Sequence, residues 1–401
     1  MRIAFLSTSS LAYPSVLGRW LPLAKEMVRL GHELHLVALH HAFGPSLRVP
    51  EVCAGVQVHY VGPMHVRGWG DQRQPLPPFP LLKVVLFSTF ALLRRALSLE
   101  VDAYQVCKPQ PINGLAGLLA AKWRRRPWYL DCDDYEAEAN RFTGRGQRAI
   151  VRWFEDALPP RAAGVSVNTR FLEQRVCSLG VHSDQVVYVP NGVERARFAA
   201  LDRESGRRLR QDYGLEGKRT VLYVGTLSLA SHPLGLLLEA FARLSVHGPD
   251  VHLVMVGGGE DRQALEKRVR QMGFAGRVTF TGAVPPDHVP RYILLGDVSV
   301  DPVYDDAVAR ARSPLKIFES MACGVAVVAG DVGDRREILG QGEAGLLVVP
   351  GDAQALADGV AGLLSDPDRR IRMGKAGQER VEAYMWDRQV HRFLSLYGLQ
   401  A

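Results

Sequence analysis

The stretch RSPLKIFESMACGVAVVAGDVGDRREIL (residues 312–339) contains a clear succession of secondary-structure patterns. Ser313 is a favourable N-cap and Pro314 suits the first helical position, so we predict that a helix starts here. Gly324 ends the helix, and the apolar run AVVA (residues 326–329) predicts a buried strand. A helix, a buried strand and a glycine-marked turn in succession are typical of an α/β fold.

The predicted helix start is also a candidate anion site. A first helical turn carries unpaired N–H groups and a partial positive charge, so we expect a phosphate to bind over residues 313–316. Lys316 and Arg312 add positive charge. One turn further on, Glu319 is placed to accept hydrogen bonds from a ribose. The same residues also fit an ordinary capped helix with Glu319 in solvent.

Strand and helix patterns alternate through both halves of the chain. The first half opens with apolar strand-like runs at residues 2–7 and 33–39, separated by a helix-like segment, and the second half restarts with TVLYVG (residues 220–225). This alternation predicts doubly wound parallel sheets in two α/β domains, at residues 1–200 and 215–384.

Composition restricts the class of protein. The chain has 401 residues, 47% hydrophobic and 23% charged, which suits two domains with separate cores. An excess of 49 Lys and Arg over 42 Asp and Glu gives a formal charge of +7, which favours anionic partners. The five cysteines form no CxxC pair and indicate neither a zinc site nor a disulfide framework.

Two features concern membranes. The chain enters a predicted strand at residues 2–7 without a charged leader or cleavable apolar core, so we expect no secretion signal and a cytoplasmic protein. The most apolar stretch, residues 81–97, carries Lys83, Arg94 and Arg95 and is shorter than the roughly 20 apolar residues of a membrane span. It fits either a helix packed on a sheet or one lying on the inner face of a membrane.

An acidic segment, DCDDYEAEANRF (residues 131–142), follows another predicted strand. Paired carboxylates shift each other's proton affinities, which suits acid and base catalysis. Three interpretations remain open: contacts to sugar hydroxyls, ligation of magnesium or manganese, or a solvated acidic turn.

Several motifs together resemble the family 4 retaining glycosyltransferases of GT-B architecture, also called glycosyl transferases group 1. The similar stretches are residues 23–39, 186–198, 221–241, 253–269, 278–303 and 312–339. The resemblance implies two Rossmann-like domains facing each other across a cleft, the N-terminal one for the acceptor and the C-terminal one for the nucleotide-sugar donor. It also implies that the last helix, in residues 385–401, crosses back to the N-terminal domain. The alternative is a terminal helix on its own domain.

The resemblance also implies a set of donor contacts. Gly18 would let the backbone approach the donor phosphates, although the family usually has a pair of glycines there. The backbone at Gly282, Ala283 and Val284 would pair with the nucleobase. The helix start would hold the diphosphate through Arg312, Ser313, Pro314, Leu315 and Lys316, with Glu319 toward the nucleoside.

This chain departs from the family at several positions. The arginine and lysine that grip the diphosphate would fall near Thr226 and His232. The first of two glutamates separated by seven residues would fall at Ala311. We expect Arg310, Arg312 and Lys316, or a protonated His232, to supply the missing charge.

In the acidic segment, the family's histidine would fall near Asp133. The resemblance assigns contacts with sugar or acceptor hydroxyls to Asp133 or Asp134, the candidate catalytic residues, and implies no metal and no other cofactor.

The combined prediction is a retaining glycosyltransferase that moves a sugar from a nucleoside-diphosphate sugar to a hydroxyl acceptor. We expect a glycan or lipid-linked acceptor in glycan, glycolipid or cell-surface polysaccharide synthesis, with an anionic membrane surface as a further candidate partner. The alternatives are a non-catalytic binding subunit, a nucleotide-sugar epimerase and a glycan phosphorylase, which would need a pyridoxal-binding lysine. Nucleic-acid binding is suggested only by KWRRRPW (residues 122–128), and we expect none.

Overall fold

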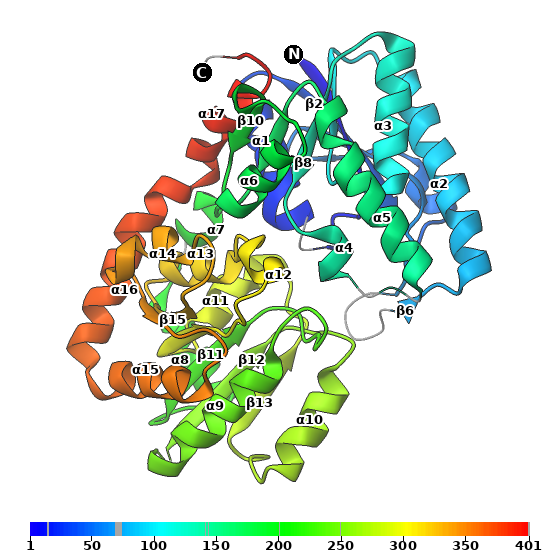
Figure 1. Ribbon diagram of the computed structural model, residues 1–401. Coiled ribbons are helices and arrows are strands. Elements are labelled where there is room, and N and C mark those ends of the chain that lie inside the picture. Colours follow the sequence, from blue (N-terminus) through cyan, green and yellow to red (C-terminus); the bar gives the residue numbers. More distant parts are fainter. Residues whose placement is uncertain are drawn as a thin grey trace. The chain divides into compact units, whose positions relative to one another are not determined.

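The computed structural model describes residues 1–13, 16–68, 74–140, 142, 144–199, 201–248 and 250–399 (Figure 1). The predicted boundary at residue 200 and the last two residues of the predicted C-terminal segment lie outside the described residues. The chain divides into two compact units. Unit 1 comprises Met1–Asn191, Ala311–Ser313 and Trp386–Ala401, and unit 2 comprises Gly192–Arg310 and Pro314–Met385.

Unit 1 is built on an eight-stranded sheet with the order β10-β9-β8-β7-β1-β2-β4-β3. All neighbours are parallel except the pair β3 and β4. A small antiparallel ribbon, β5 with β6, lies outside this sheet. The strands are β1 (Arg2–Ser7), β2 (Glu33–His40), β3 (Glu51–Cys53), β4 (Val56–Pro63), β5 (Val66–Arg67), β6 (Gln74–Pro75), β7 (Ala103–Val106), β8 (Trp128–Cys132), β9 (Val165–Val167) and β10 (Val186–Tyr188).

Helices cover both faces of this sheet, and each face has its own apolar core. One core contains Leu92 and Ala96 of α2 and Ile112 and Ala116 of α3. The other core contains residues of α1 and of the last helix, α17, including Phe393. The helices of unit 1 are α1 (Leu21–Arg29), α2 (Pro78–Ser98), α3 (Pro111–Arg124), α4 (Glu136–Ala139), α5 (Arg145–Ala157), α6 (Arg170–Ser178) and α17 (Trp386–Ser395).

Unit 2 has a six-stranded parallel sheet with the order β13-β12-β11-β14-β15-β16. Its strands are β11 (Arg219–Val224), β12 (Val251–Val256), β13 (Val278–Gly282), β14 (Val298–Asp301), β15 (Ala326–Gly330) and β16 (Leu346–Val348). Helices α9 and α15 contribute to the core on one face, and α13 to the core on the other. The helices are α7 (Arg195–Ala199), α8 (Arg203–Asp212), α9 (Leu234–His247), α10 (Arg262–Gln271), α11 (Val289–Ile293), α12 (Ala307–Arg310), α13 (Leu315–Ala322), α14 (Arg335–Ile338), α15 (Ala353–Ser365) and α16 (Pro367–Val381).

Each sheet has one point where the strand order reverses. In unit 1 it lies between β1 and β7, and in unit 2 between β11 and β14. Loops at the carboxyl ends of such neighbouring strands diverge to opposite faces and leave a crevice where α/β proteins bind ligands. The prediction of two doubly wound α/β domains is therefore confirmed, and these two points are where ligand sites are expected.

The opening stretch folds largely as its sequence predicts. Helix α13 is followed by Gly324 at φ 69° and then by the buried strand β15. A side chain at Gly324 would be strained by this left-handed backbone and would collide with Gln378, so glycine is required there. The predicted cap is wrong, because the helix begins at Leu315 with Pro314 as its N-cap.

No helix in the described part of the chain is long and apolar enough to span a membrane.

Candidate functional site

The switch point of unit 2 is occupied by a lysine from the start of α13. Lys316 Nζ lies 2.9 Å from Asp301 Oδ1, at the end of β14, and 5.1 Å from the ring centre of Tyr223 in β11. Arg335 binds the other oxygen of the same carboxylate at 2.8 Å. The lysine therefore stands between the two strands where the order reverses.

Charge in this cluster favours an anion. Burial by itself raises the Asp301 pKa, but Lys316 and Arg335 outweigh it and hold the carboxyl pKa well below its ordinary value. One carboxylate thus faces two cations, which leaves a net positive charge. The contact with Asp301 holds the lysine side chain in place.

Glycine residues follow the ends of the neighbouring strands β11 and β12. Gly225, after β11, and Gly257, after β12, have φ of 152° and 136°. A Cβ added to Gly257 would lie 2.1 Å from the carbonyl oxygen of Gly225, so the two loops meet backbone to backbone. Glycine is therefore required at Gly257, because a side chain there would collide with the neighbouring loop.

Ser313 has a different role from the predicted one. Its hydroxyl accepts a hydrogen bond from the Asn191 backbone N–H at 3.0 Å, and its carbonyl accepts one from the Asn191 side chain at 2.8 Å. No side chain caps α13, whose N-cap is Pro314. The first helical N–H groups belong to Leu315 and Lys316, and they give the start of α13 its partial positive charge.

Glu319 faces an arginine that the sequence did not single out. Its carboxylate accepts a hydrogen bond from Arg197 at 3.2 Å, and Arg197 also donates to the Pro286 carbonyl at 2.7 Å. Burial raises the Glu319 pKa, although Arg197 and Lys316 oppose this shift. Arg197 therefore ties the glutamate to the loop after β13, and the solvated alternative for Glu319 is excluded.

That loop begins with Gly282, Ala283 and Val284. Gly282 has φ 76°, and its carbonyl accepts a hydrogen bond from Gly257 N–H at 3.2 Å. Ala283 is exposed, and Val284 packs partly on the core under α13. The segment thus presents backbone at the carboxyl edge of the sheet, on the side of β12 and β13.

Thr226 and His232 lie in the loop after β11. The Thr226 carbonyl accepts a hydrogen bond from the Tyr223 hydroxyl at 3.4 Å, and the His232 ring packs edge-on against Tyr223. The same tyrosine lies beside Lys316, so both residues belong to the edge of the sheet that holds the lysine.

In unit 1, one acid of the segment 131–142 is part of the core. Asp131 accepts two hydrogen bonds of 2.7 Å from Arg19 and further ones from Trp20 and Ser166. Burial raises its pKa, but the arginine outweighs this and the pKa is lowered. Gly18 precedes Arg19 and Trp20 in a π-helical turn (Val16–Trp20), so it lies in a helical turn and not in an open loop.

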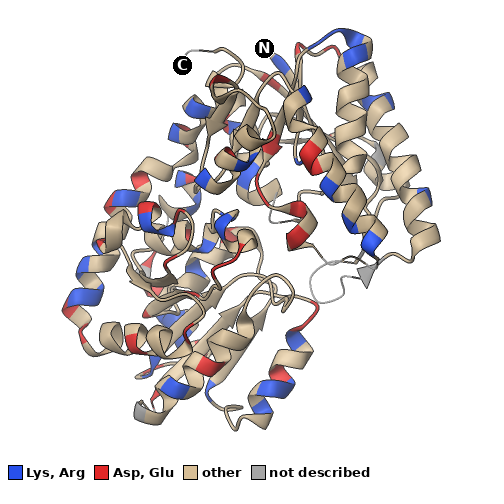
Figure 2. Cartoon of the chain, in the orientation of Figure 1, with Lys and Arg blue, Asp and Glu red and all other residues tan. Residues whose placement is uncertain are grey.

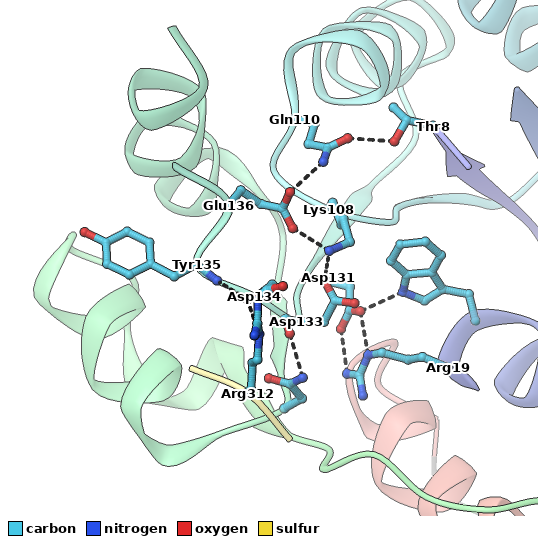
Figure 3. Close-up of polar contacts among 12 residues, drawn as sticks. Thr8, Arg19, Lys108, Gln110, Asp131, Asp133, Asp134, Tyr135, Glu136 and Arg312 are labelled. Carbon is cyan, nitrogen blue, oxygen red and sulfur yellow. Dashed lines mark hydrogen bonds and ion pairs between the residues drawn. The ribbon is translucent and has the colours of Figure 1, made fainter. Parts of the chain in front are cut away.

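Lys108 lies at the switch point of unit 1 and binds two other acids of the segment (Figure 3). Its Nζ is 3.1 Å from Asp133 Oδ1 and also bonds to Glu136, which in turn accepts a hydrogen bond from Gln110. Gln110 accepts a hydrogen bond from Thr8 at the end of β1, so the cluster joins the two strands that flank the switch point. Lys108 is not glycine yet has φ 134°, a strained backbone of the kind found at functional sites.

In the cluster around Lys108, the surrounding charges favour the protonated form of Asp133. Burial, together with Asp131 and Glu136, raises the Asp133 pKa to about 7 against the opposing effect of Lys108. The Glu136 pKa is lowered, because Lys108 outweighs the effect of burial. One lysine faces two carboxylates, and the ion pair with Glu136 leaves Asp133 as the group that gains or loses a proton near neutral pH.

The remaining cations and acids are paired as well. Asp134 lies 3.7 Å from Arg312 and accepts a hydrogen bond from Tyr135 N–H at 2.9 Å. Glu138 binds Arg148 and Arg152, and the exposed Arg310 binds Asp305. Arg310 and Arg312 are thus engaged with acids, whereas Lys316 and Arg335 share Asp301 in unit 2.

The structure brings some of the predicted residues together and adds others that the sequence did not single out. Lys316, Glu319 and the segment 282–284 lie along one edge of the sheet of unit 2, as expected from their positions after strands. Lys108, Arg197 and Asp301 were not singled out, because their partners lie on other elements, from 15 residues away for Asp301 to 122 residues away for Arg197. Strand order was the one indication that could have found Lys108, which follows the strand at residues 103–106.

Within the described ranges, no group of three or more His, Cys, Asp or Glu side chains is arranged to hold a metal ion.

Comparison with known proteins accounts for most of the chain. Residues 206–380 match the family model described as glycosyl transferases group 1, and residues 19–192 match the glycosyl transferase 4-like domain. Residues 206–380 contain all six strands of the sheet of unit 2, and residues 19–192 contain every strand of the sheet of unit 1 except β1. The chain belongs to the family 4 glycosyltransferases.

Curated relatives agree with this family. The chain is 31% identical over 225 residues to a GDP-mannose-dependent alpha-(1-6)-phosphatidylinositol monomannoside mannosyltransferase of Mycolicibacterium smegmatis, covering 55% of this chain and 58% of the relative. It is 34% identical over 227 residues to the alpha-D-kanosaminyltransferase of Streptomyces kanamyceticus, covering 56% and 57%. The chain thus spans a little over half the length of the curated relatives it matches.

Solved structures confirm the fold. Sucrose-phosphate synthase from Thermosynechococcus elongatus superposes with a TM-score of 0.78 at 21% identity, over 99% of this chain and 98% of that one. Anabaena HepE in complex with UDP and glucose superposes with a TM-score of 0.73 at 19% identity, over 98% and 99%. The predicted GT-B fold is therefore confirmed.

Proposed function

We propose that the protein is a glycosyltransferase that moves a sugar from a nucleoside-diphosphate sugar to a hydroxyl acceptor. The observation that carries this proposal is the position of Lys316, largely buried at the switch point of unit 2, at the start of a helix and beside glycine backbone. A diphosphate is the common part of all such donors. The net positive charge of the cluster around Lys316 would attract this diphosphate.

The donor would lie along the carboxyl edge of unit 2. Lys316 and the first amides of α13 would face the diphosphate and stabilise the charge that develops as it leaves the sugar. Glu319, oriented by Arg197, would accept hydrogen bonds from the ribose, and the backbone of residues 282–284 would pair with the base. Thr226, His232 and Gly18 complete the proposed donor contacts.

Asp133 and Asp134 are the proposed contacts for sugar or acceptor hydroxyls. Asp133 is the better candidate for exchanging a proton, because its pKa is raised to about 7, mainly by burial. We propose retention of the anomeric configuration by same-face displacement, in which the leaving phosphate helps to deprotonate the acceptor. No protein nucleophile is assigned.

We propose that no metal is needed. Within unit 2, Asp301 faces Lys316 and Arg335. Within unit 1, Asp133 and Glu136 face Lys108, and Asp134 faces Arg312. In each unit, cationic side chains thus pair with the carboxylates that a metal would otherwise bind. Activity that persists in excess EDTA would support this part of the proposal, and loss of activity that magnesium restores would contradict it.

The proposed acceptor is a glycan or a lipid-linked sugar, in glycolipid or cell-surface polysaccharide synthesis. The named mannosyltransferase acts on a phosphatidylinositol monomannoside, which is the precedent for a lipid-linked acceptor. We propose that the protein works in the cytoplasm, at the inner face of the membrane, where such an acceptor is exposed.

A non-catalytic binding subunit is the second candidate. It is favoured by Thr226, His232 and Ala311, which stand where the family has two cations and a glutamate. A panel of nucleotide sugars separates the two, with thermal stabilisation and release of nucleoside diphosphate measured for each. Stabilisation by one nucleotide sugar with slow diphosphate release supports the transferase. Stabilisation without release over many acceptors supports the binding subunit, and stabilisation by none contradicts both.

A further inference from the structure

Helix α2 exposes an apolar face to solvent. Five large apolar side chains on it are more than half exposed, at fractions of 54% to 82%. They recur with helical spacing and therefore lie on one face, opposite the buried Ser88, Leu92 and Ala96. The exposed residues are Phe79, Leu82, Leu86, Phe87 and Phe90.

The size of this face calls for an explanation. The three phenylalanines alone leave on the order of 400 Å² of apolar side chain in water, at about 200 Å² for each aromatic residue. Apolar patches of this size mark interaction sites on soluble proteins. The helix is anchored through its other face, so the exposed face is not needed for its packing in unit 1.

The neighbouring helix α3 extends the same surface. Both helices contribute to the same core of unit 1 and hence cover the same face of its sheet (Figure 1). Along its outer side α3 exposes Leu115, Leu119 and Trp123, the last at 80%. A tryptophan exposed beside basic residues is common at the boundary between lipid headgroups and acyl chains.

Charge on these two helices has a single sign. Neither α2 nor α3 contains an aspartate or a glutamate, and Figure 2 shows no acidic colour on these two helices. Lys83 and Arg94 lie on the exposed apolar face of α2, and Lys122 and Arg124 are exposed sequence neighbours of Trp123. Cationic side chains within an apolar surface complement a bilayer with anionic headgroups. In a symmetric dimer, by contrast, this surface would place like charges against each other.

We propose that the exposed faces of α2 and α3 form a docking surface for an anionic lipid bilayer. The phenylalanines and leucines enter the headgroup and acyl boundary, and the basic side chains meet lipid phosphates. No helix spans the bilayer in this arrangement, in agreement with the helices of the described segments. The surface acts without donor or acceptor, so its test is independent of the proposed transfer.

The test is co-flotation of the full chain with vesicles of phosphatidylglycerol and phosphatidylcholine in equal parts, or of phosphatidylcholine alone, without nucleotide sugar. We expect binding to the anionic vesicles that weakens with salt. The triple variant Phe79→Ser, Leu86→Ser, Phe90→Ser should bind at least tenfold more weakly, and so should Lys83→Glu with Arg94→Glu. Unchanged thermal unfolding of these surface variants shows that they remain folded.

The matched control is Val246→Ser with Ile371→Ser, since these residues of unit 2 are similarly exposed, at 74% and 66%. The control should bind as the unmodified protein does. The proposal is overturned if the unmodified protein does not float, or if the triple variant floats equally well. It is also overturned if sedimentation velocity finds a dimer that the triple variant abolishes while neither protein binds vesicles.

Discussion

Lys316 and Asp301 form a buried ion pair at the reversal of strand order in unit 2, with Nζ 2.9 Å from Oδ1. Unit 1 has a comparable pair at its own reversal, where Lys108 lies 3.1 Å from Asp133. The two pairs differ in how many cations and carboxylates surround them. Asp301 faces two cations and stays ionised, whereas Asp133 shares one lysine with Glu136 and has a raised pKa. The first environment suits an anionic ligand, and the second suits exchange of a proton.

Removing the charge of Asp301 should destabilise the protein. In Asp301→Asn, the buried Arg335 and Lys316 lose their common carboxylate, which costs about 3–5 kcal/mol for a broken buried pair. Chemical denaturation measures this cost. Asp305→Asn is the control, because Asp305 pairs with Arg310 at the surface and should change stability little. Equal effects of the two substitutions would refute the structural role of Asp301.

Asp133 should give the stability a distinct pH dependence. Its folded pKa of about 7 lies above the ordinary value of 3.8, so the folded state holds a proton that the unfolded state has lost between these values. The free energy of unfolding therefore falls as pH rises through this window, by up to about 1.4 kcal/mol per pH unit for one proton. Asp133→Asn cannot ionise and should gain stability relative to the unmodified protein between pH 5 and pH 7.

The measurement is denaturation at several pH values, with Asp134→Asn as the control at the adjacent, less buried acid. Burial also raises the Glu155 pKa to about 7, but that residue is present in every variant and cancels in the comparison. A stability difference between Asp133→Asn and the unmodified protein that is constant from pH 5 to pH 8 would disprove the assignment of the proton.

Glu319→Gln should weaken binding of the nucleoside part of a donor. The substitution keeps the shape of the side chain but removes the charge that strengthens a hydrogen bond to ribose, a loss of about 1–3 kcal/mol. Titration calorimetry with a nucleoside diphosphate and with inorganic pyrophosphate checks this, since only the former should bind more weakly. Glu379→Gln, on the exposed side of α16, is the control. Unchanged nucleoside diphosphate affinity would count against this role.

Gly257→Ala should disturb the strand ends beside Lys316. The new Cβ would lie 2.1 Å from the Gly225 carbonyl oxygen at a positive φ, so backbone must move at a cost of about 2 kcal/mol or more. Gly362→Ala is a matched control in α15, where no atom lies within 4 Å of the added Cβ. That control should be stabilising by about 0.5–1 kcal/mol through helix propensity. Thermal unfolding that ranks the two variants in the opposite order would rule out the close backbone contact.

The sequence could predict those features of the fold that depend on only a few neighbouring residues. Gly324 and the apolar run after it were sufficient to place a helix end and strand β15, because glycine conformation and burial act over a few residues. The role of Ser313 was mispredicted, because its hydroxyl has a hydrogen-bond partner, Asn191, more than a hundred residues away.

The roles of the acids in residues 131–142 likewise could not be predicted, because they depend on long-range contacts. Asp131, Asp133 and Asp134 look alike in sequence, but one binds Arg19, one binds Lys108 and one binds Arg312. Which acid is structural and which can take up a proton depends on these long-range partners. The spacing of the acids along the chain carries no information about them.

The central claim is that Lys316 holds the diphosphate of a nucleotide sugar, and calorimetric titration of UDP and GDP into three proteins tests it most directly. The unmodified protein should bind one of the two, and Lys316→Met should bind it at least tenfold more weakly, while Asp301 keeps its pair with Arg335. Lys375→Met, at an exposed lysine of α16, should bind as the unmodified protein does. Binding of neither nucleotide, or equal binding by Lys316→Met, would contradict the claim.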